Sequence, residues 1–159
     1  EGLLVERMRE RQQSLAVAEC GTHGAVAGRL MAVDDAGLAL RRGTATSTIG
    51  AMAAALGVEP STVGSDASGA LLLARAARLA AGAHVGLCVV CTNAPTGGEG
   101  WVYIGVSVED SGEAVRTACL VGGPQRVRVG GVEMGLDCLR RFLGGLSIDD
   151  LIDFEKQPA

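Results

Sequence analysis

The segment at positions 15–33, LAVAECGTHGAVAGRLMAV, decides the fold. Residues 15–19 form a short and almost entirely apolar stretch, which is typical of a buried strand. Cys20-Gly21-Thr22-His23-Gly24 then interrupts the pattern, because two glycines within five residues favour a turn. Residues 25–33 resume with apolar side chains at helical spacing. A strand, a Gly-rich turn and a helix in this order predict one unit of an α/β sheet.

The same reasoning extends outward in both directions. Asp66 is a predicted N-cap, and Gly57 and Gly82 each follow a helical segment where a left-handed residue is favoured. The segment 125–143 mixes strand-like alternation with helical spacing, and we interpret it as a helix in which Gly130 and Gly131 allow close packing. The expected helices are 3–13, 25–33, 49–56, 66–81 and 125–143, and the expected strands are 14–19, 38–47, 85–91, 101–108 and 113–121.

Helices alternate with strands in the first half of the chain, and strands follow one another in the second half. This order predicts a three-layer α/β/α sandwich with a mixed, mostly parallel sheet of about five strands. We expect a single domain at 1–146 and an acidic C-terminal tail at 147–159 that forms a short helix or turn and then frays. No internal repeat or linker divides the chain.

Composition excludes several classes of protein. The 159 residues are 48% hydrophobic and only 3% aromatic, with a formal net charge of −4. A mildly acidic chain with few aromatic residues is not expected to bind nucleic acid. No uninterrupted apolar run reaches the roughly 18 residues of a membrane span, so we expect no membrane partner. Thirteen of the 14 basic residues are arginines, and Lys156 is the only lysine.

The five cysteines do not suggest a disulfide framework, because their number is odd and they lie in apolar segments. Cys88 and Cys91 have CxxC spacing, but within a predicted strand residues three apart face opposite sides and cannot share a metal. We therefore expect structural cysteines, no metal and no cofactor. A reducing, cytoplasmic location is the expectation. No signal peptide is visible, and the chain begins without methionine, as a piece of a longer protein would.

Two Gly-rich loops follow the two most buried strands, at 20–24 and 92–100. In an open α/β sheet, ligands bind at the carboxyl ends of the strands. If the two strands are neighbours, both loops line one crevice. The first loop also leads into a helix, whose free N–H groups favour an anion. A small molecule that carries a phosphate or a carboxylate is the simplest ligand.

Chemistry in this crevice centres on Cys20, which we expect at a strand end near a helix N-terminus, where a thiol can serve as a nucleophile. His23 is the candidate base. A small apolar side chain in a turn and a solvent-facing histidine are the alternatives for these two residues. Glu19 and Thr22 can orient loop groups or contact a substrate. Arg42 and Arg128 can clamp a phosphate or remain solvated surface charges.

The stretch LAVAECGTHGAVAGRLMAV resembles the start of the CinA C-terminal domain family, which typically has T-A-E-S-C-T-G-G before a helix. Ala18, Glu19, Thr22 and Gly24 stand in the matching places. Three later stretches, LRRGTATSTIGAMAAALGV, VGLCVVCTNAPTGGEGWVYIGV and PQRVRVGGVEMGLDCLRRFL, resemble later parts of the family in the same order. The resemblance covers nearly the whole chain, although each motif is loose by itself.

The resemblance implies an α/β/α sandwich with a mixed sheet. It also implies hydrolysis of the carboxamide of nicotinamide mononucleotide to nicotinate mononucleotide and ammonia, by a serine nucleophile with a lysine base. The substrate-binding positions implied for this chain are Glu19, Gly21, Thr22, Gly24, Arg42, Thr92, Asn93, Ala94 and Arg128.

This chain departs from the family pattern at the catalytic positions. Cys20 replaces the serine, His23 replaces a glycine, and the lysine and tyrosine positions fall at about Met52 and Ala39. These losses favour a catalytically degenerate domain that retains binding of a nucleotide or small anion. The alternative is an amidohydrolase in which Cys20 is the nucleophile and His23 the base. Small-residue helices favour a homodimer or higher homo-oligomer.

Overall fold

The computed structural model describes residues 1–93, 97–151 and 155–156. A five-stranded mixed sheet lies at its centre, with strand order β2-β1-β3-β4-β5. β1 is parallel to β2 and to β3, whereas β3–β4 and β4–β5 are antiparallel. The elements are α1 (Gly2–Glu10), β1 (Leu15–Cys20), α2 (Ala25–Met31), β2 (Leu40–Thr46), α3 (Ile49–Ala55), α4 (Ala67–Ala81), β3 (Val85–Asn93), β4 (Glu99–Val108), β5 (Gly112–Val121) and α5 (Pro124–Leu143).

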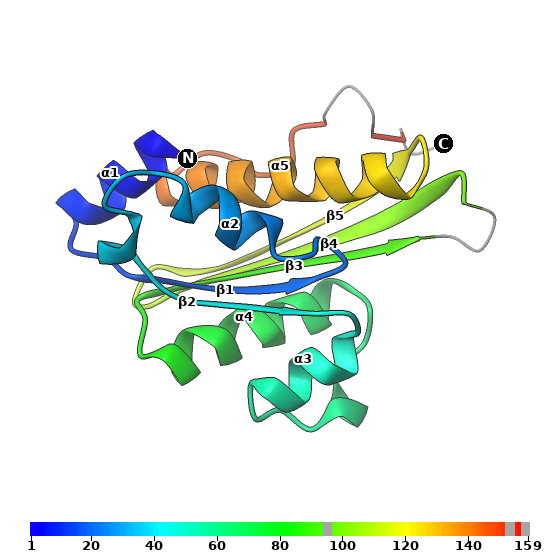
Figure 1. The fold of residues 1–159 in the computed structure, drawn as a ribbon, viewed down its shortest axis with the longest axis horizontal. Coiled ribbons are helices and arrows are strands. Elements are labelled where there is room, and N and C mark those ends of the chain that lie inside the picture. Colours follow the sequence, from blue (N-terminus) through cyan, green and yellow to red (C-terminus); the bar gives the residue numbers. More distant parts are fainter. Residues whose placement is uncertain (94–96, 152–154, 157–159) are drawn as a thin grey trace.

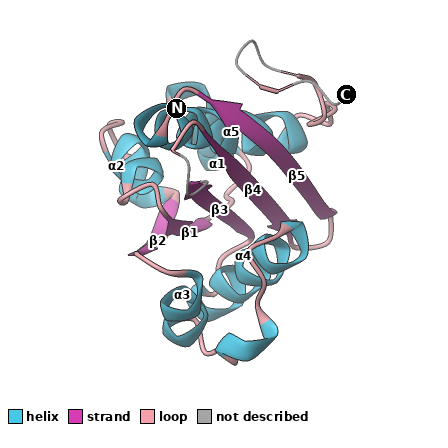
Figure 2. Ribbon diagram, turned by 90° about the vertical axis from the view of Figure 1, so that its right-hand side faces the viewer, coloured by secondary structure: helices cyan, strands magenta, loops and turns pink. Residues whose placement is uncertain are grey.

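Helices cover both faces of this sheet. α1, α2 and α5 lie on one side and α3 and α4 on the other (Figure 1; the side view in Figure 2 separates the layers). Two apolar cores result, a larger one beneath α5 and a smaller one of short side chains against α4. The three-layer α/β/α fold with a mixed sheet is therefore confirmed, with parallel and antiparallel neighbours in equal number rather than a parallel majority.

α4 begins and ends at the capping residues that the sequence predicts. The Asp66 carboxylate accepts a hydrogen bond from the backbone N–H of Gly69 at 2.7 Å, which satisfies one of the free donors of the first turn. Gly82 ends the helix in the left-handed conformation, with φ of 58°. Within the described residues no helix is long and apolar enough to cross a membrane.

The ambiguous segment before the tail is one long helix, α5, as predicted. A Cβ atom on Gly131 would lie 2.3 Å from the Cys91 sulfur, and one on Gly135 would lie 2.5 Å from a methyl group of Val89. The helix therefore approaches β3 closely only because these positions lack side chains. This contact fixes α5 above the carboxyl-terminal half of β3.

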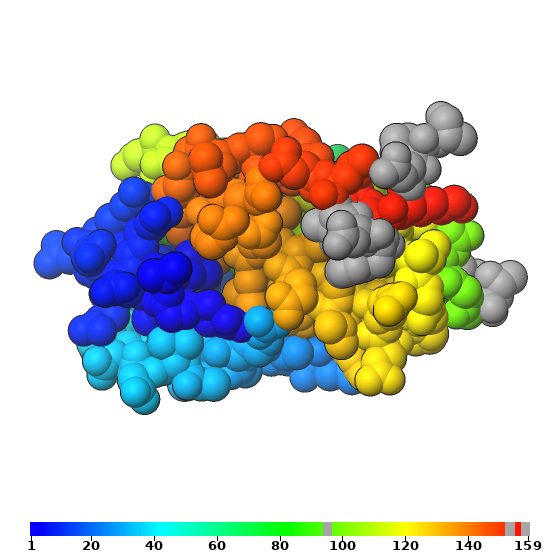
Figure 3. Space-filling model, turned by 90° about the horizontal axis from the view of Figure 1, so that it is seen from above, coloured from blue at the N-terminus to red at the C-terminus, as the bar shows by residue number. Residues whose placement is uncertain are grey.

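His84 follows the end of α4, and its Nδ1 accepts a hydrogen bond from the Ser14 N–H at 3.1 Å, which joins the starts of β1 and β3. The expectation that the tail frays is wrong at Glu155 and Lys156. Glu155 forms a bridge with Leu120 of β5, and the Lys156 N–H donates to the Cys119 carbonyl. Figure 3 shows the described part of the tail, in red, beside α5.

Candidate functional site

The two Gly-rich loops begin at the same edge of the sheet. Cys20 is in register with Val90 on β3, so the 20–24 loop and the segment after β3 both leave from the carboxyl ends of parallel strands. Gly21 packs directly on β3, because a Cβ atom there would lie 2.3 Å from the Cys91 carbonyl oxygen. Its φ of +81° also favours glycine. The 20–24 loop thus packs through its backbone directly against β3.

Glu19 has a defined role in this loop. Its side chain is buried, with 1% exposure, and it accepts hydrogen bonds from the Thr22 hydroxyl at 2.6 Å and from the N–H groups of Val26 and Ala27 at 2.9 and 2.8 Å. An internal carboxylate therefore occupies the N-terminus of α2. The free donors that we expected to attract an external anion are already satisfied here, and Thr22 is fully buried.

Cys20 faces the opposite layer. Successive strand residues alternate sides, so the carboxylate of Glu19 enters the α2 side while the Cys20 thiol joins the apolar cluster beneath α3 and α4. Cys20 is 6% exposed. Burial raises the pKa of its thiol above the ordinary value. The thiol is therefore held in its protonated form, which is the less nucleophilic one.

Among the described residues, His23 forms no hydrogen bond with Cys20. Its Nδ1 lies 3.0 Å from a guanidinium nitrogen of Arg128, on α5. A guanidinium can only donate, so this nitrogen is the acceptor of the imidazole. The backbone at His23 has φ of 59°, a conformation that glycine adopts more easily. His23 and Arg128 thus meet on the α5 side, across the sheet from the thiol.

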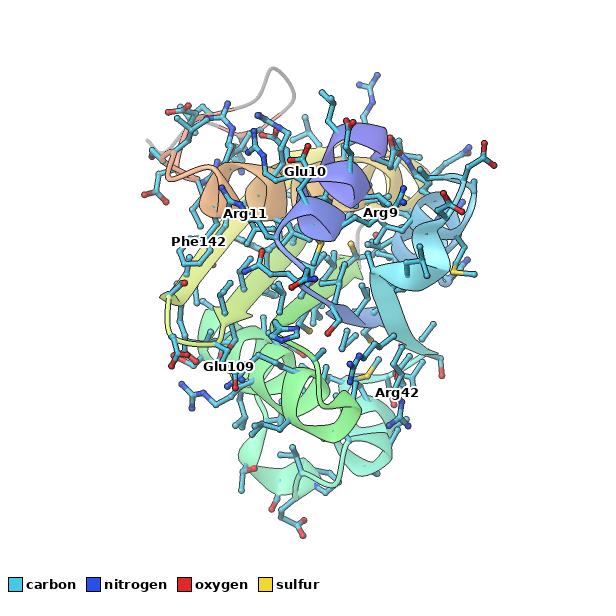
Figure 4. The ribbon with its side chains drawn as sticks, turned by 90° about the vertical axis from the view of Figure 1, so that its left-hand side faces the viewer. Arg9, Glu10, Arg11, Arg42, Glu109 and Phe142 are labelled. Atoms are coloured by element: carbon cyan, nitrogen blue, oxygen red, sulfur yellow. The ribbon has the colours of Figure 1, made fainter. Side chains whose placement is uncertain are left out.

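The remaining predicted residues do not converge on one point. The Thr92 hydroxyl donates to the Trp101 carbonyl at 3.4 Å, and Asn93 ends β3 opposite Gly100. Arg42 is in register with Ala16, four residues before Cys20 and therefore roughly 13 Å away along the strand. Figure 4 shows Arg42 on the α3 side of the sheet. Gly24 begins α2 as its left-handed N-cap, and Ala94 lies outside the described residues.

The positions matched to the family lysine and tyrosine differ in their relation to Cys20. Met52, at the lysine position, is fully buried in the same apolar cluster as Cys20. Ala39 accepts a hydrogen bond from the N–H of Leu15, at the opposite end of β1. The tyrosine correspondence therefore does not reach the site. Thr46 lies beside Cys20 in register on β2, a neighbour that the sequence does not predict because pairing register is not visible in it.

The CxxC pair is structural, as the strand geometry predicts. Cys88 belongs to the cluster beneath α4 and Cys91 to the cluster beneath α5, so the two sulfurs face opposite layers. Burial raises the pKa of Cys88 far above its ordinary range and that of Cys91 to about 12. All five cysteines are free thiols.

Comparison with known proteins gives consistent results. A model of the CinA C-terminal domain matches residues 1–143. A CinA-like protein from Frankia casuarinae is 35% identical over 156 residues, which is 92% of this chain and 35% of that protein. The chain spans about a third of the length of the curated relatives it matches.

Solved structures agree in fold. A competence-damaged protein (CinA) superfamily protein from Escherichia coli superimposes with a TM-score of 0.76 at 22% identity, covering 89% of this chain and 87% of that one. The competence/damage inducible protein CihA from Agrobacterium tumefaciens gives 0.71 at 23% identity, covering 89% and 94%. At such identities the agreement concerns the fold. With the family model matching nine-tenths of its length, the chain belongs to the CinA C-terminal domain family.

Proposed function

We propose that this chain is a catalytically degenerate CinA C-terminal domain, which keeps the fold and a ligand crevice but not amide hydrolysis. The observation that carries the proposal is the environment of Cys20. A nucleophile of acyl transfer needs a neighbouring group to take its proton. Cys20 is buried, and burial raises the pKa of its thiol. The candidate base His23 is hydrogen-bonded to Arg128 on the α5 side of the sheet.

The lack of a lysine base supports the same conclusion. Met52, at the family's lysine position, is fully buried in the same apolar cluster as Cys20 and has no proton-accepting group. The single lysine of the chain, Lys156, pairs with Glu99 at 3.1 Å. Neither residue can activate the thiol. The chain therefore has the family's nucleophile position without the family's means of activating a nucleophile.

Binding of a nucleotide or small anion is the retained activity in this proposal. Because Glu19 satisfies the α2 N-terminus, the charge of such a ligand would be met by Arg128 rather than by helix N–H groups. Arg128 is half-buried beside His23, near the Gly-rich loop. Thermal denaturation with millimolar nicotinamide mononucleotide tests this point. We expect a rise in Tm that Arg128→Gln abolishes, and no rise for the wild type would contradict retained binding.

The alternative is an amidohydrolase, and one observation favours it: Cys20 ends β1, at the position of the family serine. In that reaction the thiolate would attack the carboxamide carbon, ammonia would leave, and water would hydrolyse the thioester to the carboxylate. The proton lost by the thiol would have to reach the leaving nitrogen. His23 is the candidate for that transfer.

Ammonia release from nicotinamide mononucleotide separates the two candidates. The wild type is compared with Cys20→Ala and with Cys138→Ala, a matched control because Cys138 is another buried thiol, on α5. The degenerate domain predicts no release above background in any of the three folded proteins. Turnover that persists in Cys138→Ala and is lost in Cys20→Ala would establish the amidohydrolase.

We also propose that the protein self-associates and is cytoplasmic. A two-fold homodimer is the expected assembly, since closed two-fold symmetry is the commonest arrangement of soluble homo-oligomers. Sedimentation velocity at micromolar concentration tests it directly. A monomer at all concentrations up to about 100 μM, far above the range of stable dimers, would contradict the expectation.

A further inference from the structure

A polar cavity lies at the end of the sheet opposite the Cys20 loop, and we propose that it binds inorganic phosphate. Its volume is about 290 Å³. Figure 4 looks onto this end of the molecule, with Arg9 of α1 labelled. The cavity is lined by Arg9, Gln12, Gln13, Ser14, Leu38, Arg41 and His84. The proposal does not depend on the crevice at Cys20.

The charged side chains that line this cavity are cationic. Arg41 donates one guanidinium N–H to the Gly82 carbonyl at 2.8 Å, which holds the side chain at the end of α4 and leaves its other donors for a ligand. Arg9 lies 3.4 Å from the Asp35 carboxylate, with both side chains well exposed. Such an exposed pair is weak and can be replaced by a better anion. Two guanidinium groups around one cavity favour an oxyanion.

His84 adds an N–H donor whose position on the imidazole ring is fixed. Its Nδ1 lies 3.1 Å from the backbone nitrogen of Ser14 and 2.9 Å from the hydroxyl of the same residue. A backbone amide can only donate, so Nδ1 must be the acceptor, and neutral His84 carries its proton on Nε2. The Ser14 contact therefore keeps an N–H donor on the other side of the ring.

Two glutamines supply a second observation at the same place. Gln12 has φ of 52°, a left-handed conformation that residues other than glycine rarely adopt. The side-chain oxygen of Gln13 is buried and makes no hydrogen bond within the described chain. Backbone strain and an unsatisfied polar atom concentrate at functional sites. The arginine and histidine donors favour a tetrahedral oxyanion with several acceptor oxygens, such as phosphate.

Titration of the full 15N-labelled chain by NMR with inorganic phosphate tests the proposal, at pH 7 and with ionic strength held constant by sodium chloride. We expect saturable shifts of the backbone amide signals of Gln12, Gln13 and His84. Sulfate, an anion of the same shape, is expected to compete with phosphate for the same signals.

A pair of matched double variants assigns the site. Arg9→Gln with Arg41→Gln is expected to weaken phosphate binding at least tenfold. The control, Arg7→Gln with Arg75→Gln, also removes two arginines, one on α1 and one in an exposed pair with Glu113, and is expected to change binding less than twofold. Absence of saturable shifts at the cavity, or equal weakening by the two double variants, would overturn the proposal.

Discussion

Glu19 and Cys20 are consecutive residues at the end of β1, and their side chains enter opposite layers of the molecule. The carboxylate completes the first turn of α2, while the thiol is buried among short apolar side chains. Because strand residues alternate sides, Glu19 and Cys20 lie on opposite faces of the sheet. Glu19 matches the family motif, whereas Cys20 would carry the family's chemistry. Retention of Glu19 is explained by its hydrogen bonds, without any substrate.

Glu19→Gln tests this structural role. A glutamine retains one acceptor oxygen but presents an NH₂ group to a neighbouring N–H, so at least one buried donor loses its partner. We expect a loss of about 2–3 kcal/mol in the free energy of unfolding, since charge-assisted buried hydrogen bonds are involved. Urea denaturation followed by circular dichroism measures it.

Glu10→Gln is the control, because Glu10 is an exposed residue of α1. Its effect should stay within about 0.5 kcal/mol. If Glu19→Gln is equally harmless, the carboxylate does not hold the loop, and a role in ligand binding becomes the better explanation of its burial.

At the scale of elements, glycines allow α5 to pack closely against β3. Gly131 and Gly135 lie against Cys91 and Val89, and their missing side chains set the distance between helix and sheet. The sequence predicted the helix and its close approach, because both depend on a local pattern of small and apolar residues. It could not identify the strand residues in contact, because that depends on register.

Gly131→Ala is expected to destabilise the protein by about 1–3 kcal/mol, because the added methyl group overlaps the Cys91 sulfur in a packed core. Gly28→Ala is the matched control, since this exposed helical glycine has no neighbour within 4 Å of an added Cβ. It should stabilise by about 0.5–1 kcal/mol through helix propensity. Thermal melts compare the two, and the same sign for both variants would refute the packing argument.

The candidate site was less predictable than the elements that carry it. Local signals placed Cys20, Gly21 and Gly24 at a strand–turn–helix junction, and the structure agrees. Partners distant in sequence were not visible. The contact of His23 with Arg128 spans 105 residues, and that of Ser14 with His84 spans 70. Each depends on how whole elements pack, which no local pattern encodes.

At the scale of the whole molecule, the C-terminal tail is bound to the edge of the sheet. Arg116 of β5 and Glu155 of the tail form an ion pair at 2.6 Å, with side chains only 9% and 5% exposed. Arg116 also donates to the backbone carbonyl of Asp150. The described tail residues therefore cover part of an edge strand that would otherwise offer free backbone groups to another chain.

Glu155→Gln is expected to lower the free energy of unfolding by about 3 kcal/mol, because it removes the carboxylate that pairs with the buried charge of Arg116. Lys156→Gln removes the neighbouring pair with Glu99, whose side chains are 59% and 39% exposed, and should cost less than about 1 kcal/mol. Urea denaturation of both variants checks the difference. Equal effects would mean that the tail does not contribute through this pair.

The most direct test of the central claim, that Cys20 is not an activated nucleophile, is the pH dependence of its alkylation in the native protein. Iodoacetamide modification is quantified by mass spectrometry on the tryptic peptide 12–29, which contains no other cysteine. Because burial raises the thiol pKa, the rate should increase with pH from about 7 to beyond 8.5, the ordinary pKa of a thiol, and stay below that of the unfolded chain throughout. A rate that is already constant below pH 7 would reveal a thiolate paired with a protonated base and would contradict the account.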